Sequence, residues 1–328
     1  MPVCPPPPAR GTEIRTYGLG NIVPDLMKDE MRKVFAAEAA DERGPSLQAR
    51  VRRTLSTARR KARSFAGRSE RRKAETAIRY MSDMARASGA PPFEERCLVG
   101  TFHKTGTMLM LRILGDFARH AETGFWNMGG GPAPAGDWHI GFDWWSDFRD
   151  HGVDPGQHPT ALLIRDPRDV IVSSMKFHRR SGEPWLHVSR EALGGRTYQE
   201  ASRACASDEE RYHFELDHQA GATIRDMLAA RRDPSHRDTL FLPVEDLMSD
   251  ASMHGYRRLL DHLGMNPAYR PLALAIAFRS SVFNPAFVRT RHVTSGKSGV
   301  WRSSLPASVL EALEDRFPNA AQELGYPA

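Results

Sequence analysis

The sequence predicts a three-layer α/β domain with a mainly parallel central sheet, preceded by an N-terminal helical extension. Two segments support this prediction, because in each an apolar run of strand length passes through a tight polar turn directly into a helix. Strands that alternate with helices are typical of parallel sheets, whose connections must return along the sheet. The chain has 328 residues, of which 40% are hydrophobic, enough for one such domain and an extension.

The first segment is the stretch from Cys97 to Met108, in which a short apolar run ends in a small, polar turn that contains Gly106. The residues from Met108 onward are amphipathic and predict a helix. Backbone N–H groups at a helix N-terminus attract anions, and Lys104 adds a full positive charge. The segment therefore predicts a phosphate-binding turn, although an ordinary turn with a solvated lysine has a similar sequence.

Four further residues of this turn are expected to contact the anion through backbone N–H groups or hydroxyls: Thr105, Gly106, Thr107 and Met108. The turn is not a Walker A motif, in which the lysine follows the second glycine. Here Lys104 precedes Gly106. An ATP or GTP enzyme of the usual P-loop kind is therefore disfavoured, while a relative of that fold is not.

The second segment combines a buried strand with the start of a helix. Its apolar core is Ala161–Ile164. Asp166 is a suitable N-cap, and Pro167 fits the first helical turn.

Arg165 stands at the carboxyl end of this strand, where open α/β sheets bind their ligands. Ser173 lies about two helical turns further on and could face the same crevice. Alternatively, Arg165 and Asp169 form a structural ion pair beside the helix start. Both roles are compatible with one another.

At these residues the chain resembles the sulfotransferases that use 3′-phosphoadenosine 5′-phosphosulfate (PAPS). In that family a loop of the type P-K-[ST]-G-T-T-W cradles the 5′-phosphosulfate, and the present chain reads HKTGTML from His103. A segment of the type R-[ND]-[AP]-[KR]-D-V-x-V-S binds the 3′-phosphate, and the chain reads RDPRDVIVS from Arg165 to Ser173. The resemblance implies a P-loop-like fold with a PAPS site.

Two later segments extend the resemblance to the C-terminus. LFLPVEDL, from Leu240, is similar to the late strand of the family that ends in Y-E-D-L. GKSGVWR, from Gly296, is similar to the R-K-G-x-x-G-x-W-[KR] segment that closes over the nucleotide. The resemblance therefore runs from about Cys97 to the end of the chain.

The chain also departs from the family pattern. Val244 stands where many members have a tyrosine that contacts adenosine. Thr294 and Ser295 replace the usual Arg and Lys, so the 3′-phosphate would lose one guanidinium partner. Three basic residues could replace it: Arg289, Arg291 and Lys297.

The resemblance implies an enzyme that transfers the sulfuryl group of PAPS to the hydroxyl of a sugar, phenol or alcohol, on a small molecule or glycan, without a metal ion. Lys104 would stabilise the phosphate oxygen that becomes the leaving group. The residues implied to bind PAPS are Lys104, Thr105, Gly106, Thr107, Met108, Arg165, Ser173, Ser295, Gly296 and Lys297. The transfer also requires a base with a pKa near neutrality, for which histidine is the usual choice.

His139 is the base that the resemblance implies. In the family a K-[TS]-H-[LF] pattern precedes the strand that ends at Arg165, and DWHIGFD, which contains His139, lies at a matching distance upstream. Asp137 replaces the usual lysine, and the alternative is that His139 is a turn or core histidine. Two other histidines are reserve candidates for the base: His151 and His158. Two more are expected to support the phosphate motifs instead: His103 and His178.

Aromatic residues gather between the first helix and the second strand. Four of them are candidates for an acceptor pocket in which a sugar or an aromatic ring stacks: Trp126, Trp138, Phe142 and Trp144. The alternative is that they pack in the core or in a lid. The Gly129–Gly136 stretch is predicted to be a flexible loop that could move over the site.

Residues 1–90 are expected to form the N-terminal extension, and residues 91–328 the sulfotransferase domain. The extension starts with a proline-rich stretch and contains a basic amphipathic helix over residues 46–73. This helix could contact a membrane surface, a polyanion or a partner protein, or simply pack one face on the domain. The net charge of +6 suits an acidic ligand such as a bisphosphorylated nucleotide, and it would equally suit nucleic acid or a membrane surface. Nucleic acid is nevertheless not expected as a partner.

The chain has no apolar run of membrane-spanning length and no hydrophobic signal-peptide core. Its three scattered cysteines predict neither a disulfide framework nor a metal site. A cytoplasmic location is therefore expected. Two other functions remain open: a kinase-like phosphotransferase on a related fold, which would need Mg²⁺, and a non-catalytic protein that binds anions or membranes.

Overall fold

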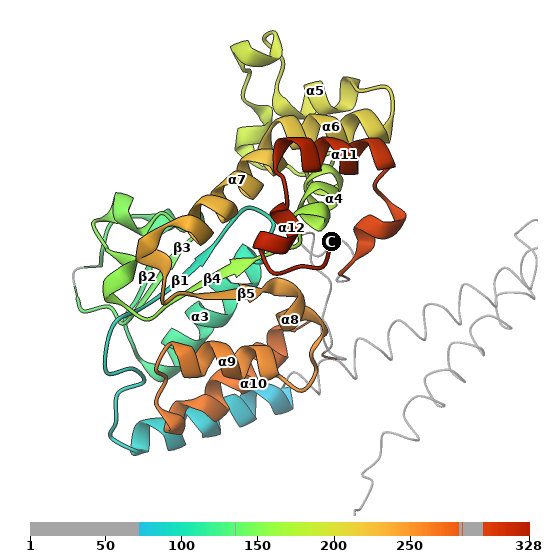
Figure 1. The fold of residues 1–328 in the computed structure, drawn as a ribbon. Coiled ribbons are helices and arrows are strands. Elements are labelled where there is room, and N and C mark those ends of the chain that lie inside the picture. The colour runs from blue at the N-terminus through green and yellow to red at the C-terminus, as the bar shows by residue number, and fades with distance from the viewer. Residues whose placement is uncertain (1–71, 135, 282–283, 285–297) are drawn as a thin grey trace, which may run out of the picture. The chain divides into compact units, whose positions relative to one another are not determined.

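In this computed structural model, which describes residues 72–134, 136–281, 284 and 298–328, five parallel strands form the central sheet (Figure 1). They are β1 (Cys97–Thr101), β2 (Phe125–Asn127), β3 (Ile140–Asp143), β4 (Thr160–Ile164) and β5 (Leu240–Pro243). Their order across the sheet is β2-β3-β1-β4-β5, and every neighbouring pair is parallel. The prediction of an α/β fold with a mainly parallel sheet is confirmed.

Helices cover both faces of the sheet (Figure 1). One face carries the helical residues 72–87, α3 (Thr107–Ala121), α8 (Val244–Ser249), α9 (His254–His262) and α10 (Arg270–Ser280), which share one buried core with the strands. The other face carries α4 (Pro167–His178), α6 (Asp208–Asp217), α7 (Gln219–Arg232), α11 (Ala307–Arg316) and α12 (Ala320–Glu323), which share a second core. Helix α5 (Tyr198–Ala204) packs beside α6. The domain thus has three layers.

The central strands are buried on both faces, because successive side chains point alternately into the two cores. In β1, Cys97 and Val99 join the core on the α3 face, and Leu98 joins the core on the α4 face. Strand β4 repeats this alternation at Ala161 and Leu162. This two-sided burial explains why both strands are continuous apolar runs in the sequence.

The predicted start of α4 is confirmed. Asp166 is its N-cap and accepts a hydrogen bond from the backbone N–H two residues further on, with Pro167 at the first helical position. Helix α9 begins at His254, where the Asp250 carboxylate accepts the His254 N–H. Both helix starts are therefore capped by a carboxylate, as the helix dipole favours.

Strands β1 and β4 are neighbours in the sheet, yet the helices that follow them lie on opposite faces. Helix α3 follows β1 and packs in one core, while α4 follows β4 and packs in the other. The two connections diverge at the carboxyl ends of these strands, which is the point at which doubly wound sheets bind their ligands. Lys104 and Arg165 follow β1 and β4 and lie at this point.

The sequence places residues 73–87 in the N-terminal extension, and the structure shows them as helical residues within the compact unit Lys73–Ala328. Ile78 is buried in the α3-face core, and Glu75 accepts a hydrogen bond from Arg279 of α10 at 2.8 Å. The rest of the basic helix predicted over residues 46–73 lies outside the described residues. No described helix is both long and apolar enough to cross a membrane.

Gly100, within β1, has no room for a side chain. An added Cβ would lie 2.5 Å from both Leu162 Cδ2 and Ser146 Oγ. We expect Gly100→Ala to lower the free energy of unfolding by about 1–3 kcal/mol, measured by urea denaturation, because overpacking forces its neighbours to shift. Gly182→Ala is the matched control, since nothing lies within 4 Å of the Cβ it would add. A wild-type stability of Gly100→Ala would contradict this packing.

Candidate functional site

The turn between β1 and α3 has an uncommon backbone conformation. Lys104 and Gly106 have φ angles of 67° and 108°. Gly106 also lies against Val244, so that an added Cβ would come within 2.9 Å of the Val244 Cγ2 atom. Both the backbone conformation and the space therefore require glycine at this position.

The threonine hydroxyls of the turn are used inside it. Thr105 Oγ1 accepts a hydrogen bond from the Phe102 N–H at 2.8 Å and donates one to the Phe102 carbonyl at 3.0 Å. The Thr105 N–H donates to the same carbonyl. Thr107 Oγ1 lies 2.9 Å from Thr101 Oγ1. Thr105 therefore braces the turn and has no polar group left for an anion, contrary to the prediction.

The N-terminus of α3 keeps several free donors. Three backbone N–H groups have no hydrogen-bond partner among the described residues: those of Gly106, Thr107 and Met108. The next two N–H groups, of Leu109 and Met110, both donate to the Gly106 carbonyl. Unpaired N–H groups at the positive end of a helix dipole are an anion-binding arrangement.

The Lys104 side chain brings a cation into a partly buried position. Its Nζ lies 3.4 Å from the centre of the Phe177 ring, over the ring face. Burial and the neighbouring Arg165 lower the pKa of Lys104 to about 7. An anion bound beside Lys104 would raise this pKa again, because an opposite charge favours the ammonium form.

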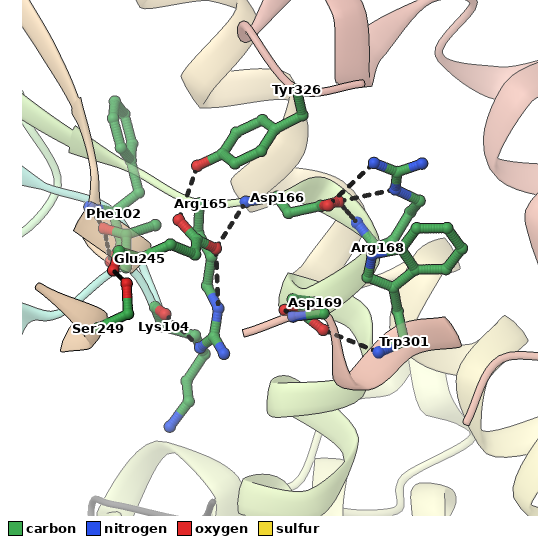
Figure 2. Close-up of polar contacts among 12 residues, drawn as sticks. Phe102, Lys104, Arg165, Asp166, Arg168, Asp169, Glu245, Ser249, Trp301 and Tyr326 are labelled. Carbon is green, nitrogen blue, oxygen red and sulfur yellow. Dashed lines mark hydrogen bonds and ion pairs between the residues drawn. The ribbon is translucent and has the colours of Figure 1, made fainter. Parts of the chain in front are cut away.

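Arg165 reaches the same turn from the end of β4. Its Nη1 donates a hydrogen bond to the Lys104 carbonyl at 3.0 Å, and its Nε lies 4.0 Å from Glu245 Oε1 (Figure 2). The Nε atom is buried without a hydrogen-bond partner. The structure therefore brings Lys104 and Arg165 together at one edge of the sheet, as the sequence predicts.

Ser173 lies on the face of α4 that is directed toward the turn. It follows Asp169 and precedes Phe177 by one helical turn each, so the three share one face. Phe177 carries the Lys104 ammonium on its ring. The Ser173 hydroxyl has no hydrogen-bond partner among the described residues.

Asp169 binds the C-terminal segment rather than Arg165. Its carboxylate accepts hydrogen bonds from the N–H groups of Gly299 at 2.6 Å and Trp301 at 2.9 Å (Figure 2). The buried Asp169 thus caps the short 3-10 helix η8 (Val300–Ser303). Three predicted ligands that directly precede this anchored segment lie outside the described residues: Ser295, Gly296 and Lys297.

The other arginine of the second motif is fully engaged. Arg168 forms a buried bidentate ion pair with Asp166, in which both N···O distances are 2.9 Å. Arg168 also donates to the Pro327 carbonyl at 2.7 Å. The Tyr326 hydroxyl donates to Glu245 Oε2 at 2.9 Å (Figure 2). The last residues of the chain are therefore tied to the second motif.

His139 lies at the opposite edge of the sheet from the turn. It directly precedes β3, and its carbonyl accepts a hydrogen bond from the N–H of Cys97, the first residue of β1, at 2.8 Å. Because the strands are parallel, His139 lies beside the amino end of β1, whereas Lys104 follows its carboxyl end. The length of β1 therefore separates the two residues. The structure therefore does not place His139 beside Lys104, contrary to the prediction.

The two reserve histidines have structural partners. His158 precedes β4, at the amino ends of the strands as His139 does, and packs edge to face against Trp138.

His151 Nε2 lies 3.2 Å from Asp143 Oδ2. Asp143 also accepts the Trp145 N–H, so this pair braces the chain after β3.

Three of the four aromatic residues predicted for an acceptor pocket are buried: Trp126, Trp138 and Phe142. The two tryptophans pack edge to face in the core, and Trp144 donates a hydrogen bond to the Asn127 side chain at 2.7 Å. These residues stabilise the core, which corrects the prediction. Trp145 is 52% exposed instead and stacks on His103, with 6.2 Å between ring centres and 13° between planes.

A hydrogen-bonded chain of side chains begins at His103, in the turn itself. His103 Nε2 lies 2.8 Å from His178 Nε2, and His178 Nδ1 lies 2.8 Å from Glu215 Oε1. The Tyr198 hydroxyl donates to Glu215 Oε2 at 2.9 Å. The sequence associates both histidines with their motifs, but no local pattern points to Glu215 on α6 or Tyr198 on α5.

Comparisons with known proteins assign no role to these residues. No protein-family model matches the chain, and no curated protein matches it. Within residues 72–134, 136–281, 284 and 298–328, no group of three or more His, Cys, Asp or Glu side chains is arranged to hold a metal ion. The function is therefore inferred from the residues themselves.

We expect Asp169→Ala to destabilise the domain by about 2–3 kcal/mol, because two backbone N–H groups lose a charged acceptor. Urea denaturation measures this change, and Asp238→Ala, at an exposed position, is the matched control. Asp169→Asn keeps one acceptor oxygen and should lose less. If Asp169→Ala unfolded at the wild-type urea concentration, the capping role of this carboxylate would be wrong.

Proposed function

We propose that this domain is a sulfotransferase that moves the sulfuryl group of PAPS to the hydroxyl of a sugar, phenol or alcohol. One observation carries the proposal: the two motif segments meet, because Arg165 donates a hydrogen bond to the Lys104 carbonyl across 61 residues of sequence. They meet at the carboxyl ends of adjacent strands, where doubly wound sheets bind nucleotides.

The residues at this point suit a ligand with phosphate groups. The α3 N-terminus offers three N–H groups without a partner among the described residues, and Arg165 keeps one buried N–H without an acceptor. Lys104 forms no ion pair with any residue that the structure describes. Burial and the neighbouring Arg165 lower the pKa of Lys104 to about 7. An anionic ligand would supply the missing acceptors and the missing counter-charge.

In this proposal the turn after β1 holds the 5′-phosphosulfate, while Arg165 and Ser173 hold the 3′-phosphate. The backbone donors to the 5′-phosphosulfate are Gly106, Thr107 and Met108. Three more ligands are proposed from the resemblance alone: Ser295, Gly296 and Lys297. Because Asp169 fixes the residues that follow these three, it anchors one end of their segment beside the site.

PAPS supplies a sulfuryl group that is already bonded to a phosphate leaving group. The protein contributes position and charge, because Lys104 stabilises the negative charge that develops on the leaving oxygen. The exposed ring of Trp145 offers a stacking surface for a sugar or phenol acceptor. The acceptor hydroxyl must also lose a proton, and His139 is not placed to take it.

Calorimetric titration with adenosine 3′,5′-bisphosphate, the product nucleotide, tests the proposal. We expect affinity in the micromolar range with a chelator present, and weak binding of ATP. Arg165→Ala should weaken bisphosphate binding about tenfold or more, because it removes a charged partner. Arg237→Ala, at an exposed position, is the matched control.

Two results of this titration would contradict the sulfotransferase proposal. A clear preference for ATP with Mg²⁺ would favour a kinase-like phosphotransferase. Binding of neither nucleotide would leave the anion-binding turn without its proposed ligand. Unchanged affinity in Arg165→Ala would count against the phosphate role of that residue alone.

The lowered pKa of Lys104 predicts proton uptake when the bisphosphate binds. With a pKa of about 7, Lys104 is mostly neutral near pH 8 and mostly charged near pH 6. A bound phosphate raises this pKa, so Lys104 should take up close to one proton near pH 8 and almost none near pH 6. Calorimetry in two buffers of different ionisation enthalpy measures the uptake.

The bound nucleotide can also take up protons. Comparison of the wild type with Lys104→Met therefore separates the proton taken up by Lys104 from those taken up by the nucleotide. Near pH 8 the wild type should take up about one proton more than the variant. Equal proton uptake in the two proteins at that pH would show that Lys104 does not change its charge on binding.

A further inference from the structure

His103 stands in the anion-binding turn, directly before Lys104. Its ring meets Phe177 edge to face with 6.3 Å between ring centres, and the Lys104 ammonium lies over the same Phe177 ring. His103 is only half-buried, and its Nδ1 has no hydrogen-bond partner among the described residues. The His103 ring, whose Nδ1 is unpartnered, and the side chain that is proposed to stabilise the leaving phosphate therefore contact the same Phe177 ring.

The buried end of the hydrogen-bonded chain determines where its protons lie. Glu215 is fully buried, and a carboxylate in that position needs hydrogen-bond donors. Tyr198 donates to one carboxylate oxygen, and His178 Nδ1 lies 2.8 Å from the other. His178 thus carries its proton on Nδ1, and in the neutral ring its Nε2 is an acceptor.

The contact between the two histidines then has only one direction. The Nε2 atoms of His103 and His178 lie 2.8 Å apart, so one must donate and the other must accept. Since His178 accepts at Nε2, His103 donates from its Nε2. The neutral His103 ring is left with a lone pair on Nδ1, the nitrogen without a partner.

His103 is poorly suited to keep a positive charge. Burial, His178 and Lys104 lower the pKa of His103 well below its ordinary value. His178 Nδ1 lies 2.8 Å from the Glu215 carboxylate, and a negative charge at that distance attracts a positive one. A proton that arrives at His103 Nδ1 is therefore more stable when the Nε2 proton moves on to His178.

We propose that His103 is the general base of this enzyme, that His178 takes up a proton from it, and that Glu215 positions His178; this inference rests on the proposed function. The acceptor hydroxyl gives its proton to His103 Nδ1, and its oxygen uses the freed electron pair to bond the sulfur. The sulfur–oxygen bond to the phosphate breaks, and its electron pair stays on the oxygen beside Lys104. The His103 Nε2 proton moves to His178 Nε2.

After this step the added positive charge lies on His178, against Glu215. The reverse transfers return the proton to solvent once the product has left. The resting arrangement, with Nδ1 of His103 unprotonated, is then restored. Every proton that leaves an acceptor is thus accounted for within the chain formed by His103, His178 and Glu215.

Proton placement can be tested without turnover. NMR of the full chain with isotopically labelled histidine distinguishes protonated from unprotonated ring nitrogens, and His103→Gln and His178→Gln assign the signals. We expect the neutral His103 ring to carry its proton on Nε2 and the neutral His178 ring to carry its proton on Nδ1. A proton on Nδ1 of the neutral His103 ring would overturn the proposal, because that nitrogen could then accept none.

Turnover separates a catalytic role from a structural one. The assay is sulfate release from radiolabelled PAPS, with water as the acceptor, beside calorimetric affinity for adenosine 3′,5′-bisphosphate. We expect His103→Gln to lower turnover about 10²–10⁴-fold, while affinity changes less than about threefold. Glu215→Gln should lower turnover by a smaller factor, also with unchanged affinity. His254→Gln, at an exposed position on the opposite face of the sheet, is the matched control.

The two proposals fail in different ways. If the wild type does not bind the bisphosphate, the sulfotransferase proposal is overturned, and the base role is overturned with it. If the bisphosphate binds, the base assignment alone is overturned either by wild-type turnover in His103→Gln or by a proton on Nδ1 of the neutral His103 ring. The NMR result decides the assignment where hydrolysis is too slow to measure.

Discussion

The parallel pairing of β1 with β4 is the constraint on which the site depends. Thr101 pairs with Leu163 near the carboxyl ends of these strands, so the residues that follow leave the sheet side by side. The helices that continue from them pack on opposite faces, and their N-termini therefore begin at one edge without covering each other. The contact between Arg165 and the Lys104 carbonyl is a direct result.

The two arginines of the second motif differ in how well the protein itself neutralises their positive charge. Arg168 has a bidentate carboxylate partner and a backbone acceptor, so its positive charge is neutralised within the protein. Arg165 has a carboxylate at 4.0 Å and keeps a buried donor without an acceptor. A buried donor of this kind is costly unless something binds it. The arginine that is less well satisfied is thus the one suited to a ligand.

Local structure could be predicted from the sequence because its signals are local. The apolar runs of β1 and β4, and the Asp166–Pro167 helix start, depend on neighbouring residues alone. The direction in which a polar side chain points depends on packing by distant segments. Thr105 has a hydroxyl that could bind an anion, but this hydroxyl bonds the backbone of its own turn. Trp145 is exposed and Trp126 is buried, and only tertiary packing distinguishes these two tryptophans.

The misplacement of His139 has a simple geometric cause. The motif match fixes the position of this histidine only approximately, and β3 has only four residues. If the motif is aligned wrongly by the length of one short strand, a residue expected at the carboxyl ends of the strands lies at their amino ends instead. The buried groups behind His103 and His178 could not be predicted either, because Glu215, which contacts His178, and Tyr198, which donates to Glu215, come from helices with no motif of their own.

The Lys104 carbonyl holds Arg165 in position before any ligand arrives, and Glu245 lies beside the guanidinium. Glu245 Oε1 also accepts the Asp166 N–H at 3.2 Å, and its Oε2 accepts the Tyr326 hydroxyl, so the carboxylate is itself immobilised. A flexible side chain that becomes ordered on binding costs about 0.5–1.5 kcal/mol, and much of that entropy is already lost here during folding. A rigid guanidinium cannot follow a ligand that fits poorly. The site can therefore distinguish two anions of equal charge by the spacing of their charged groups.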